Sequence, residues 1–271
     1  MATDNANATT VKLNENALAK VEDTATQLEQ ISKSFGLDGL VNVSPIMRAV
    51  RLSQGVQALR EILTIERVKF LFMPLMGSPL GFLTDRDRKP DKYSPEVVRD
   101  VLVEAFLRGF MPTGNEFNII SERFYAAHNG LERKVLEFKG VSGVCLTPGV
   151  PEPGPAGSAL VSYRATWYLD GEQMSIVCEN KGGIDTRIPV NVNNGMGPDA
   201  ILGKAERKIY HRILKRLLGN SGAILGSEES DLPLNVSVPL ALSAVSDPPA
   251  VTSPAQNGQR LKLNREPGQE G

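Results

Sequence analysis

Apolar residues recur at steps of three and four along residues 12–35, the first patterned segment of the chain. This spacing places them on one side of a helix and leaves charged residues on the other side. We expect an amphipathic helix here, either packed on a neighbouring subunit or covering the core of its own domain. The apolar positions are Leu13, Ala17, Val21, Ala25, Leu28, Ile31 and Phe35.

Two serine-proline pairs mark the starts of further helices. In Ser44-Pro45 and Ser94-Pro95 the serine is suited to cap a helix, and the proline is suited to the first helical position. The first pair predicts a helix to about Leu63, with Gly55 as a candidate interruption. The second pair predicts a helix that stops at Gly109.

The segments that follow these two helices differ in pattern. A short helix is expected over residues 64–73 and a charged, exposed loop over residues 84–93. After a Gly-Asn turn, short strands at about 116–120 and 123–127 predict a hairpin. Residues 131–138 then have the pattern of a short helix.

Strand-like segments dominate the next part of the chain. Residues 140–148, 158–169 and 172–180 are rich in Val, Ser, Tyr and Thr. Asp170-Gly171 separates the last two, and an Asp-Gly pair between strands is a strong hairpin signal. The Pro- and Gly-rich segment 148–157 is expected to be a loop, because proline fits poorly in a strand.

A final helix is expected from Pro198-Asp199 to about Gly219-Asn220, after an irregular stretch over residues 182–197. Helices, a hairpin, a helix, antiparallel strands and a helix follow one another, which predicts an α+β fold. We expect an antiparallel sheet and hairpin core packed with helices, between flexible N- and C-terminal segments.

Composition divides the chain into three parts. Residues 1–40 form an N-terminal helical segment and residues 41–220 the core. Residues 221–271 are expected to be a disordered tail, because from Ser227 onward the chain is rich in Pro, Ser, Gly, Asn and Gln and has no aromatic residue. Such a segment buries too little apolar area to offset the entropy lost on ordering.

Charge follows the same division. Residues 41–219 carry 24 basic and 19 acidic side chains, whereas residues 1–40 and 220–271 each carry 3 basic and 6 acidic ones. A basic core between acidic ends suits an anionic ligand, and a chance imbalance in an ordinary soluble protein is the alternative. No secretion signal and no run of about 18 apolar residues is present, which argues against secretion and membrane insertion.

The chain offers little for a metal or a redox centre. It has two cysteines, Cys145 and Cys178, and two histidines, His128 and His211, without metal-ligand spacing. Both cysteines lie in apolar, strand-like runs, which predicts buried thiols in a reducing compartment. We expect no metal and no cofactor.

The last helix carries the clearest functional signal. At 100° per residue its cations gather on one side and its apolar residues on the other, so that one side can be anchored while the other faces phosphates. A solvated face of a surface helix is the alternative. The cationic side comprises Lys204, Arg207, Lys208, His211, Arg212 and Lys215, and the apolar side comprises Ala205, Ile209, Ile213, Leu214 and Leu217, with Tyr210 beside them.

Aromatic and basic residues also lie close together on the predicted strands, in RFY at 123–125 and in YRATWY at 163–168. Proteins that hold single strands need stacking surfaces and a cationic track along the backbone. Alternation directs Arg123 and Tyr125 to one face and Phe124 to the core. Trp167, the only tryptophan, is expected to pack in the core rather than to stack on bases.

The order of these motifs resembles the RecT/Redβ-type single-strand annealing proteins of phages and prophages. The resemblance rests on EAFLRGFMPTGNEFNIISERFYAAHNGLERKV at 104–135 and GKAERKIYHRILKRLLG at 203–219, and it covers most of residues 94–219. The sequence departs from the family in VNVNNGMGPDA, where many relatives have a Trp ahead of the final helix.

The resemblance implies binding of single-stranded DNA and ATP-independent annealing of complementary strands in homologous recombination, by a ring or helical filament of identical subunits in the cytoplasm of a bacterial host. It also implies an annealed duplex intermediate, and a tail that recruits a host single-strand binding protein or a phage exonuclease. The residues that match are Arg123, Tyr125, Lys204, Lys208, Arg212 and Lys215, and Lys181 and Arg187 are weaker candidates. Arg207, on the cationic side of the last helix, is a further candidate for DNA binding.

Enzymatic functions are disfavoured. The chain lacks a GxxxxGK[ST] phosphate loop, and a nuclease would need carboxylates clustered for two metal ions. Glu116, Glu122, Glu172, Glu179 and Asp185 are scattered near strand ends without a spacing signature. The main alternative to annealing is an oligomeric phage structural or assembly protein that does not bind DNA and uses the basic helix for subunit contacts.

Overall fold

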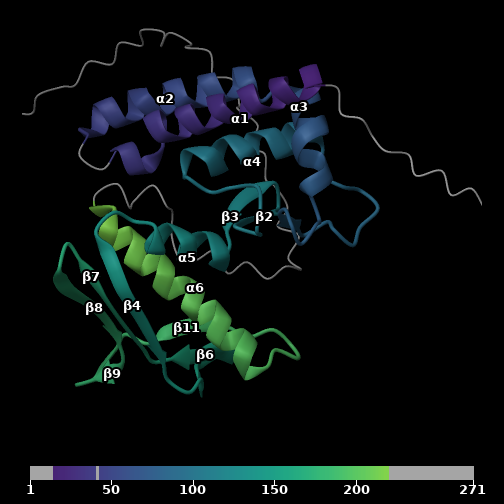
Figure 1. Cartoon of the computed structure of the whole chain (residues 1–271). Coiled ribbons are helices and arrows are strands. Elements are labelled where there is room, and N and C mark those ends of the chain that lie inside the picture. Colours follow the sequence, from purple (N-terminus) through teal and green to yellow (C-terminus); the bar gives the residue numbers. More distant parts are fainter. Residues whose placement is uncertain (1–14, 41–42, 220–271) are drawn as a thin grey trace, which may run out of the picture. The chain divides into compact units, whose positions relative to one another are not determined.

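The computed structural model describes residues 15–40 and 43–219 and has an α+β fold, as predicted (Figure 1). The expected tail and the first part of the N-terminal segment, including Leu13, lie outside the described residues. The helices are α1 (Glu15–Phe35), α2 (Pro45–Ile62), α3 (Ile65–Arg67), α4 (Pro95–Leu107), α5 (His128–Leu136) and α6 (Pro198–Leu217). The strands are β1 (Leu83–Thr84), β2 (Phe117–Ile120), β3 (Arg123–Ala126), β4 (Val141–Pro148), β5 (Glu152–Pro153), β6 (Ser158–Val161), β7 (Tyr163–Leu169), β8 (Glu172–Cys178), β9 (Asn180–Lys181), β10 (Ile184–Asp185) and β11 (Ile188–Asn191).

The predicted helix starts are confirmed by their caps. The Ser44 hydroxyl accepts a hydrogen bond from the Met47 amide, and the Ser94 hydroxyl accepts one from the Val97 amide, each at 3.5 Å. Each bond satisfies an amide that has no partner within its own helix, which favours a helix start at this residue. The short helix predicted after α2 is present as α3, continued by wider and tighter helical turns over Val68–Phe72 and Met73–Leu75.

Helix α2 continues through Gly55, so the expected interruption there is wrong. A Cβ atom at Gly55 would stand 2.7 Å from the Leu107 Cδ2 atom and 2.8 Å from the Phe35 Cβ atom. The glycine therefore permits a close approach of α1, α2 and α4. Helix α1 packs on α2 and α4 of its own chain, where Leu28 is buried, so it covers the core of its own domain.

Two strand predictions need correction. Residues 158–169 form two strands, because β6 pairs with β11 and β5 whereas β7 pairs with β4 and β8. The chain passes from one sheet to the other at Ser162. The stretch expected to be irregular contains β11, in which Ile188 and Val190 are buried. The segment expected to be a loop contains β5, an edge strand, and an edge position tolerates Pro153, which has no backbone N–H to donate.

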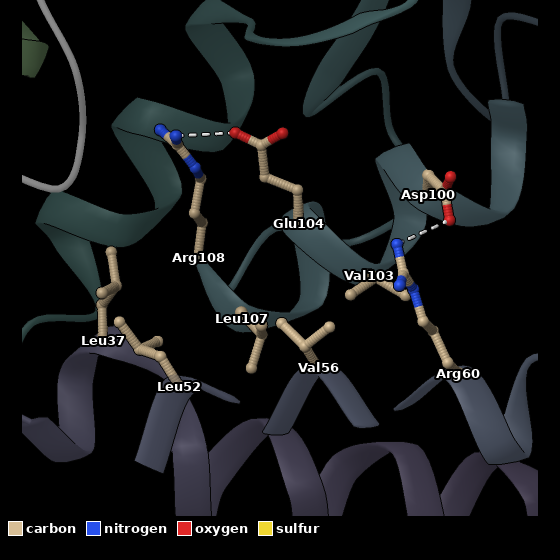
Figure 2. A pocket seen from close by; sticks show the side chains of 9 residues that line it. All are labelled: Leu37, Leu52, Val56, Arg60, Asp100, Val103, Glu104, Leu107 and Arg108. Carbon is tan, nitrogen blue, oxygen red and sulfur yellow. Dashed lines mark hydrogen bonds and ion pairs between the residues drawn. The ribbon is translucent and has the colours of Figure 1, made fainter. Parts of the chain in front are cut away.

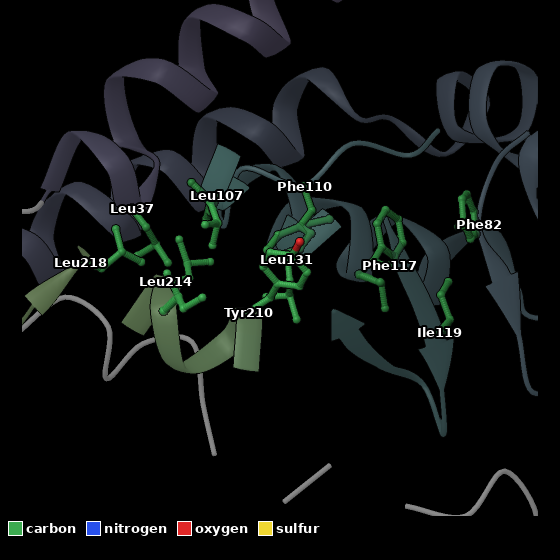
Figure 3. Packing of buried hydrophobic residues seen from close by; sticks show 14 of the residues in the cluster. Leu37, Phe82, Leu107, Phe110, Phe117, Ile119, Leu131, Tyr210, Leu214 and Leu218 are labelled. Atoms are coloured by element: carbon green, nitrogen blue, oxygen red, sulfur yellow. The ribbon is translucent and has the colours of Figure 1, made fainter. Parts of the chain in front are cut away.

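One buried cluster joins the helices to the sheets. Figure 3 shows Leu214 of α6 and the following Leu218 in the same cluster as Leu37, which follows α1, and Leu107, the last residue of α4. Trp167 is fully buried, as predicted for a core residue. Helix α6 thus packs within the core of the described part of the chain, and nine of its 20 residues are buried.

Candidate nucleic-acid interface

Strand β3 places Phe124 on one face and Arg123 and Tyr125 on the other, as predicted. Phe124 packs on the core side, with its ring centroid 5.2 Å from that of Phe110 and 5.6 Å from that of Phe117. Arg123 and Tyr125 point to the opposite face by alternation. Arg123 is exposed, and no hydrogen bond or ion pair joins its side chain to another residue within 15–40 or 43–219.

The turn before β3 is strained and is held from outside the hairpin. Ser121 and Glu122 have φ angles of 51° and 63°, a region that residues other than glycine occupy at a cost of about 1–2 kcal/mol each. The Ser121 amide donates to the Asp85 carboxylate at 3.3 Å, and the Glu122 amide donates to the Tyr93 hydroxyl at 3.1 Å. These contacts fix the tip from which Arg123 projects.

Tyr93 and Asp85, which hold the Ser121-Glu122 turn, are also bonded to each other. The Tyr93 hydroxyl donates to the Asp85 carboxylate at 2.6 Å, and Tyr93 is 2% exposed. Burial, reinforced by the hydrogen bond to Asp85, raises the pKa of Tyr93 above its ordinary value. Both residues lie in the segment expected to be an exposed loop, so the sequence did not indicate that they position the hairpin.

The hairpin and the final helix meet at Tyr125. The guanidinium carbon of Arg207 lies 4.6 Å from the centroid of the Tyr125 ring, a cation–π distance. Tyr125 and Arg207 are each partly exposed. An aromatic side chain of β3 and a cation of α6 therefore lie on one surface, with Arg123 two residues along the strand. We call Arg123, Tyr125 and Arg207 the hairpin–helix surface.

Among the other cations predicted for the open face of α6, Lys208 and His211 are buried, so the prediction is wrong for these two residues. Lys208 is only 8% exposed and donates to the Pro189 carbonyl at 2.7 Å, while His211 is 6% exposed. Lys204 donates to the Asn191 carbonyl at 3.1 Å, and Arg212 donates to the Cys178 sulfur at 3.1 Å. The sheets pack against this side of the helix, and its cations satisfy acceptors at their edges.

The remaining predicted contacts differ from one another. Arg187 is held by two carboxylates, with 2.7 Å contacts to Asp185 and to Glu152, so its charge is balanced within the chain and we leave it out of the interface. Lys181 and Lys215 are exposed, and neither side chain forms a hydrogen bond or ion pair with another of the residues described in this structure. A role of these two lysines in DNA binding stays a prediction.

Helix α5 fixes the position of α6 near Arg207. The Tyr210 hydroxyl donates to Glu132 at 3.1 Å, and the His128 ring meets the Tyr210 ring edge-on at 5.3 Å. The His128 Nε2 atom also lies 3.6 Å from the Glu206 carboxylate, beyond hydrogen-bond distance. Burial, and then the charge of Glu132, raises the pKa of Tyr210. These contacts orient the turn of α6 that carries Arg207.

Two of the carboxylates considered for metal binding, Glu116 and Asp185, are paired with arginines. Glu116 is buried and accepts from the Arg133 guanidinium at 2.7 Å, and the pKa of Arg133 is raised by this hydrogen bond. Hydrogen bonds from Arg187 lower the pKa of Asp185. In the described parts of the chain no group of three or more His, Cys, Asp or Glu side chains could hold a metal ion.

A cavity of about 330 Å³ lies between α2 and α4, lined by apolar side chains with ion pairs above them (Figure 2). Arg60 contacts Asp100 at 3.3 Å, and Arg108 contacts Glu104 at 2.6 Å. Each cation at the cavity is thus matched by a carboxylate, so the cavity is poorly suited to phosphate and we do not include it in the interface. Its apolar lining consists of Leu37, Leu52, Val56, Val103 and Leu107.

Comparison of the chain with protein-family models, curated sequences and solved structures finds no match. The proposals below therefore rest on the residues themselves and on the resemblance described above. Among the helices that the structure describes, none is long and apolar enough to cross a membrane.

Proposed function

We propose that this protein binds single-stranded DNA without sequence preference and anneals complementary strands without ATP. The observation that carries the proposal is the contact of Arg207 with the Tyr125 ring, which brings the closing helix and the aromatic strand onto one surface beside Arg123. Cations that grip phosphates and an aromatic ring that supports a base are the two elements that single-strand binders combine.

Annealing requires that the protein leave base edges accessible. Contacts to phosphates position a strand but carry no sequence information, so base pairing between the two strands can select the complement. Base pairing also supplies the free energy that drives annealing, so nucleotide hydrolysis is not needed. If each subunit neutralises about four phosphates, the logarithm of affinity should fall with the logarithm of salt concentration with a slope of about −3 per subunit.

We propose further that the protein acts as an oligomer, a ring or a helical filament, in which the hairpin–helix surfaces of neighbouring subunits line one continuous track. An apolar patch on α2 suits a subunit contact, because Ile46, Met47 and Val50 are 78%, 48% and 44% exposed. The same patch favours the second candidate function, an oligomeric assembly protein that does not bind DNA.

A strand-pairing assay separates these candidates. A labelled oligonucleotide and its complement are mixed with purified protein in the absence of ATP, and duplex formation is followed over time. We expect faster duplex formation and binding by fluorescence anisotropy. Absence of binding together with concentration-dependent assembly would support the second candidate. Metal-dependent loss of the oligonucleotide would contradict both and indicate a nuclease.

Charge reversal tests the surface itself. Arg123→Glu with Arg207→Glu should weaken oligonucleotide binding by more than tenfold, since two attractive contacts with phosphates become repulsive. The matched control is Arg67→Glu with Lys69→Glu, which makes the same change of charge at two exposed positions on and after α3. Equal loss of binding in both variants would show that only net charge matters and would remove the hairpin–helix surface from the site.

A further inference from the structure

The central strand of the β4–β7–β8 sheet has one buried and one open side. Tyr163, Ala165 and Trp167 of β7 are buried in the core. Arg164, Thr166 and Tyr168 alternate with them and point to the opposite face of the sheet. Arg164 and Tyr168 are exposed, so the described residues leave this outer face of the sheet uncovered.

The flanking strands add no negative charge to this face. Pairing in register places uncharged side chains beside the three β7 residues, and no carboxylate occupies an outward position of β4, β7 or β8. Arg164 is the one charged side chain on the outer face of these strands, and none of the other described residues bonds to its guanidinium. The outward neighbours are Ser142, Cys145, Thr147, Gln173, Ser175 and Val177.

Tyr168 is supported as an exposed aromatic platform. Gly143 lies at an irregularity of β4 with φ of 58°, and a Cβ atom there would stand 3.1 Å from Cδ2 of the Tyr168 ring. The ring therefore lies close to Gly143 of β4, where a Cβ atom would require it to shift by a few tenths of an ångström. Tyr168 is nevertheless 44% exposed, so a large part of its surface is open to a ligand.

We propose that this outer face is a second contact for a single DNA strand, in which a base stacks on Tyr168 and a phosphate binds Arg164. The two residues are four positions apart on one strand, about 13 Å, so the base and the phosphate belong to different nucleotides. The inference rests on the proposed function, because it assigns a further part of the path of the same ligand.

The chemistry of the face favours a nucleic acid over a second copy of the chain. Hydroxyl, amide and thiol groups surround Arg164 and Tyr168, and Val177 is the one large apolar side chain among the outward positions of the three strands. Subunit interfaces have apolar centres, whereas single-strand sites combine aromatic platforms with cations in polar surroundings.

Cys145 supplies a test in the unmodified protein. It is exposed, so the expectation that both thiols are buried is wrong for Cys145. It pairs with Thr166, midway between Arg164 and Tyr168, whereas Cys178, the second cysteine of the chain, is buried. The rate of alkylation of Cys145 by N-ethylmaleimide is measured by intact mass with and without an oligo(dT) strand. We expect the strand to slow alkylation of Cys145 at concentrations that saturate binding.

Variants of Tyr168 identify the stacking contact. Tyr168→Ala should weaken oligo(dT) binding by about tenfold to a hundredfold, the range for loss of one stacked base, and should remove the protection of Cys145. Tyr168→Phe keeps the ring and should keep both properties. Thermal unfolding and the fluorescence of buried Trp167 verify that each variant is folded.

Three results would overturn the inference. If oligo(dT) binds by anisotropy but leaves the alkylation rate of Cys145 unchanged, the outer face is not a contact and the proposed function still stands. If oligo(dT) does not bind at all, the proposed function fails and the inference fails with it. If Cys145 is protected without DNA as protein concentration rises, a second copy of the chain covers the face instead.

Discussion

The two hairpins that carry the proposed DNA contacts have the same kind of turn, made from different residues. Asp170 and Gly171 join β7 to β8 with φ angles of 50° and 88°, and Ser121 and Glu122 join β2 to β3 with φ angles of 51° and 63°. Two-residue turns with positive φ match the twist of a hairpin, and Asp-Gly is suited to them. Ser-Glu is not, because neither residue favours this region.

The difference shows two ways of specifying one geometry. The Asp-Gly turn is favoured by its own residues, and the Asp170 amide also donates to the Gly140 carbonyl at 2.9 Å. The Ser-Glu turn depends on Asp85 and Tyr93, which are remote in sequence and bind both turn amides. We infer that the tertiary structure sets the turn of the β2–β3 hairpin, whereas the turn of the β7–β8 hairpin is set by its own sequence.

Removal of the Tyr93 hydroxyl should give the largest effect. Tyr93→Phe deletes a hydrogen bond to a carboxylate and one from the Glu122 amide, so we expect the free energy of unfolding to fall by about 2–3 kcal/mol. Urea unfolding followed by tryptophan fluorescence measures this change. Tyr168→Phe in the other hairpin is the matched control and should change stability by less than about 0.5 kcal/mol. Equal effects would contradict the distinction between the hairpins.

Glycine substitution should have opposite signs in the two turns. Glu122→Gly relieves a strained φ and should raise the free energy of unfolding by about 1 kcal/mol, whereas Gly171→Ala introduces such strain and should lower it by about the same amount. Combining Glu122→Gly with Tyr93→Phe should recover part of the stability lost in Tyr93→Phe. The comparison fails if Glu122→Gly destabilises the protein.

The contribution of each hairpin to DNA binding can be read from salt dependence. Arg123→Ala and Arg164→Ala should each reduce the magnitude of the slope of log affinity against log salt by about 0.7, the value for one phosphate contact on a single strand. Fluorescence anisotropy of labelled oligo(dT) between low and moderate salt measures both. An unchanged slope in one variant would exclude that hairpin from the path of the strand.

The smallest effect should appear at alkaline pH. Because the folded state raises the pKa of Tyr93, this hydroxyl contributes stability that is fully present below the unfolded pKa of about 10 and is lost as pH rises through the folded pKa. The difference in stability between the wild-type protein and Tyr93→Phe should therefore narrow from pH 8 to pH 11. Chemical unfolding at several pH values checks this, and a difference that widened would show that the sign is wrong.

Much of the fold could be predicted from local patterns. The serine caps of α2 and α4, the Asp-Gly hairpin and the opposite faces of Phe124 and Tyr125 are found as expected. Strand β11 was missed because its four residues are too short a segment for periodicity to stand out.

The sequence by itself determined where α2 and α4 begin and where the Asp-Gly hairpin turns, since capping and turn chemistry act within a few residues. Only the tertiary structure decided which cations are buried. Lys208 and Arg207 are neighbours on α6, yet Lys208 is buried against a carbonyl of β11 and Arg207 lies on the ring of Tyr125. Helical periodicity assigns a residue to a side of its helix, but the contacts made on that side depend on segments distant in sequence.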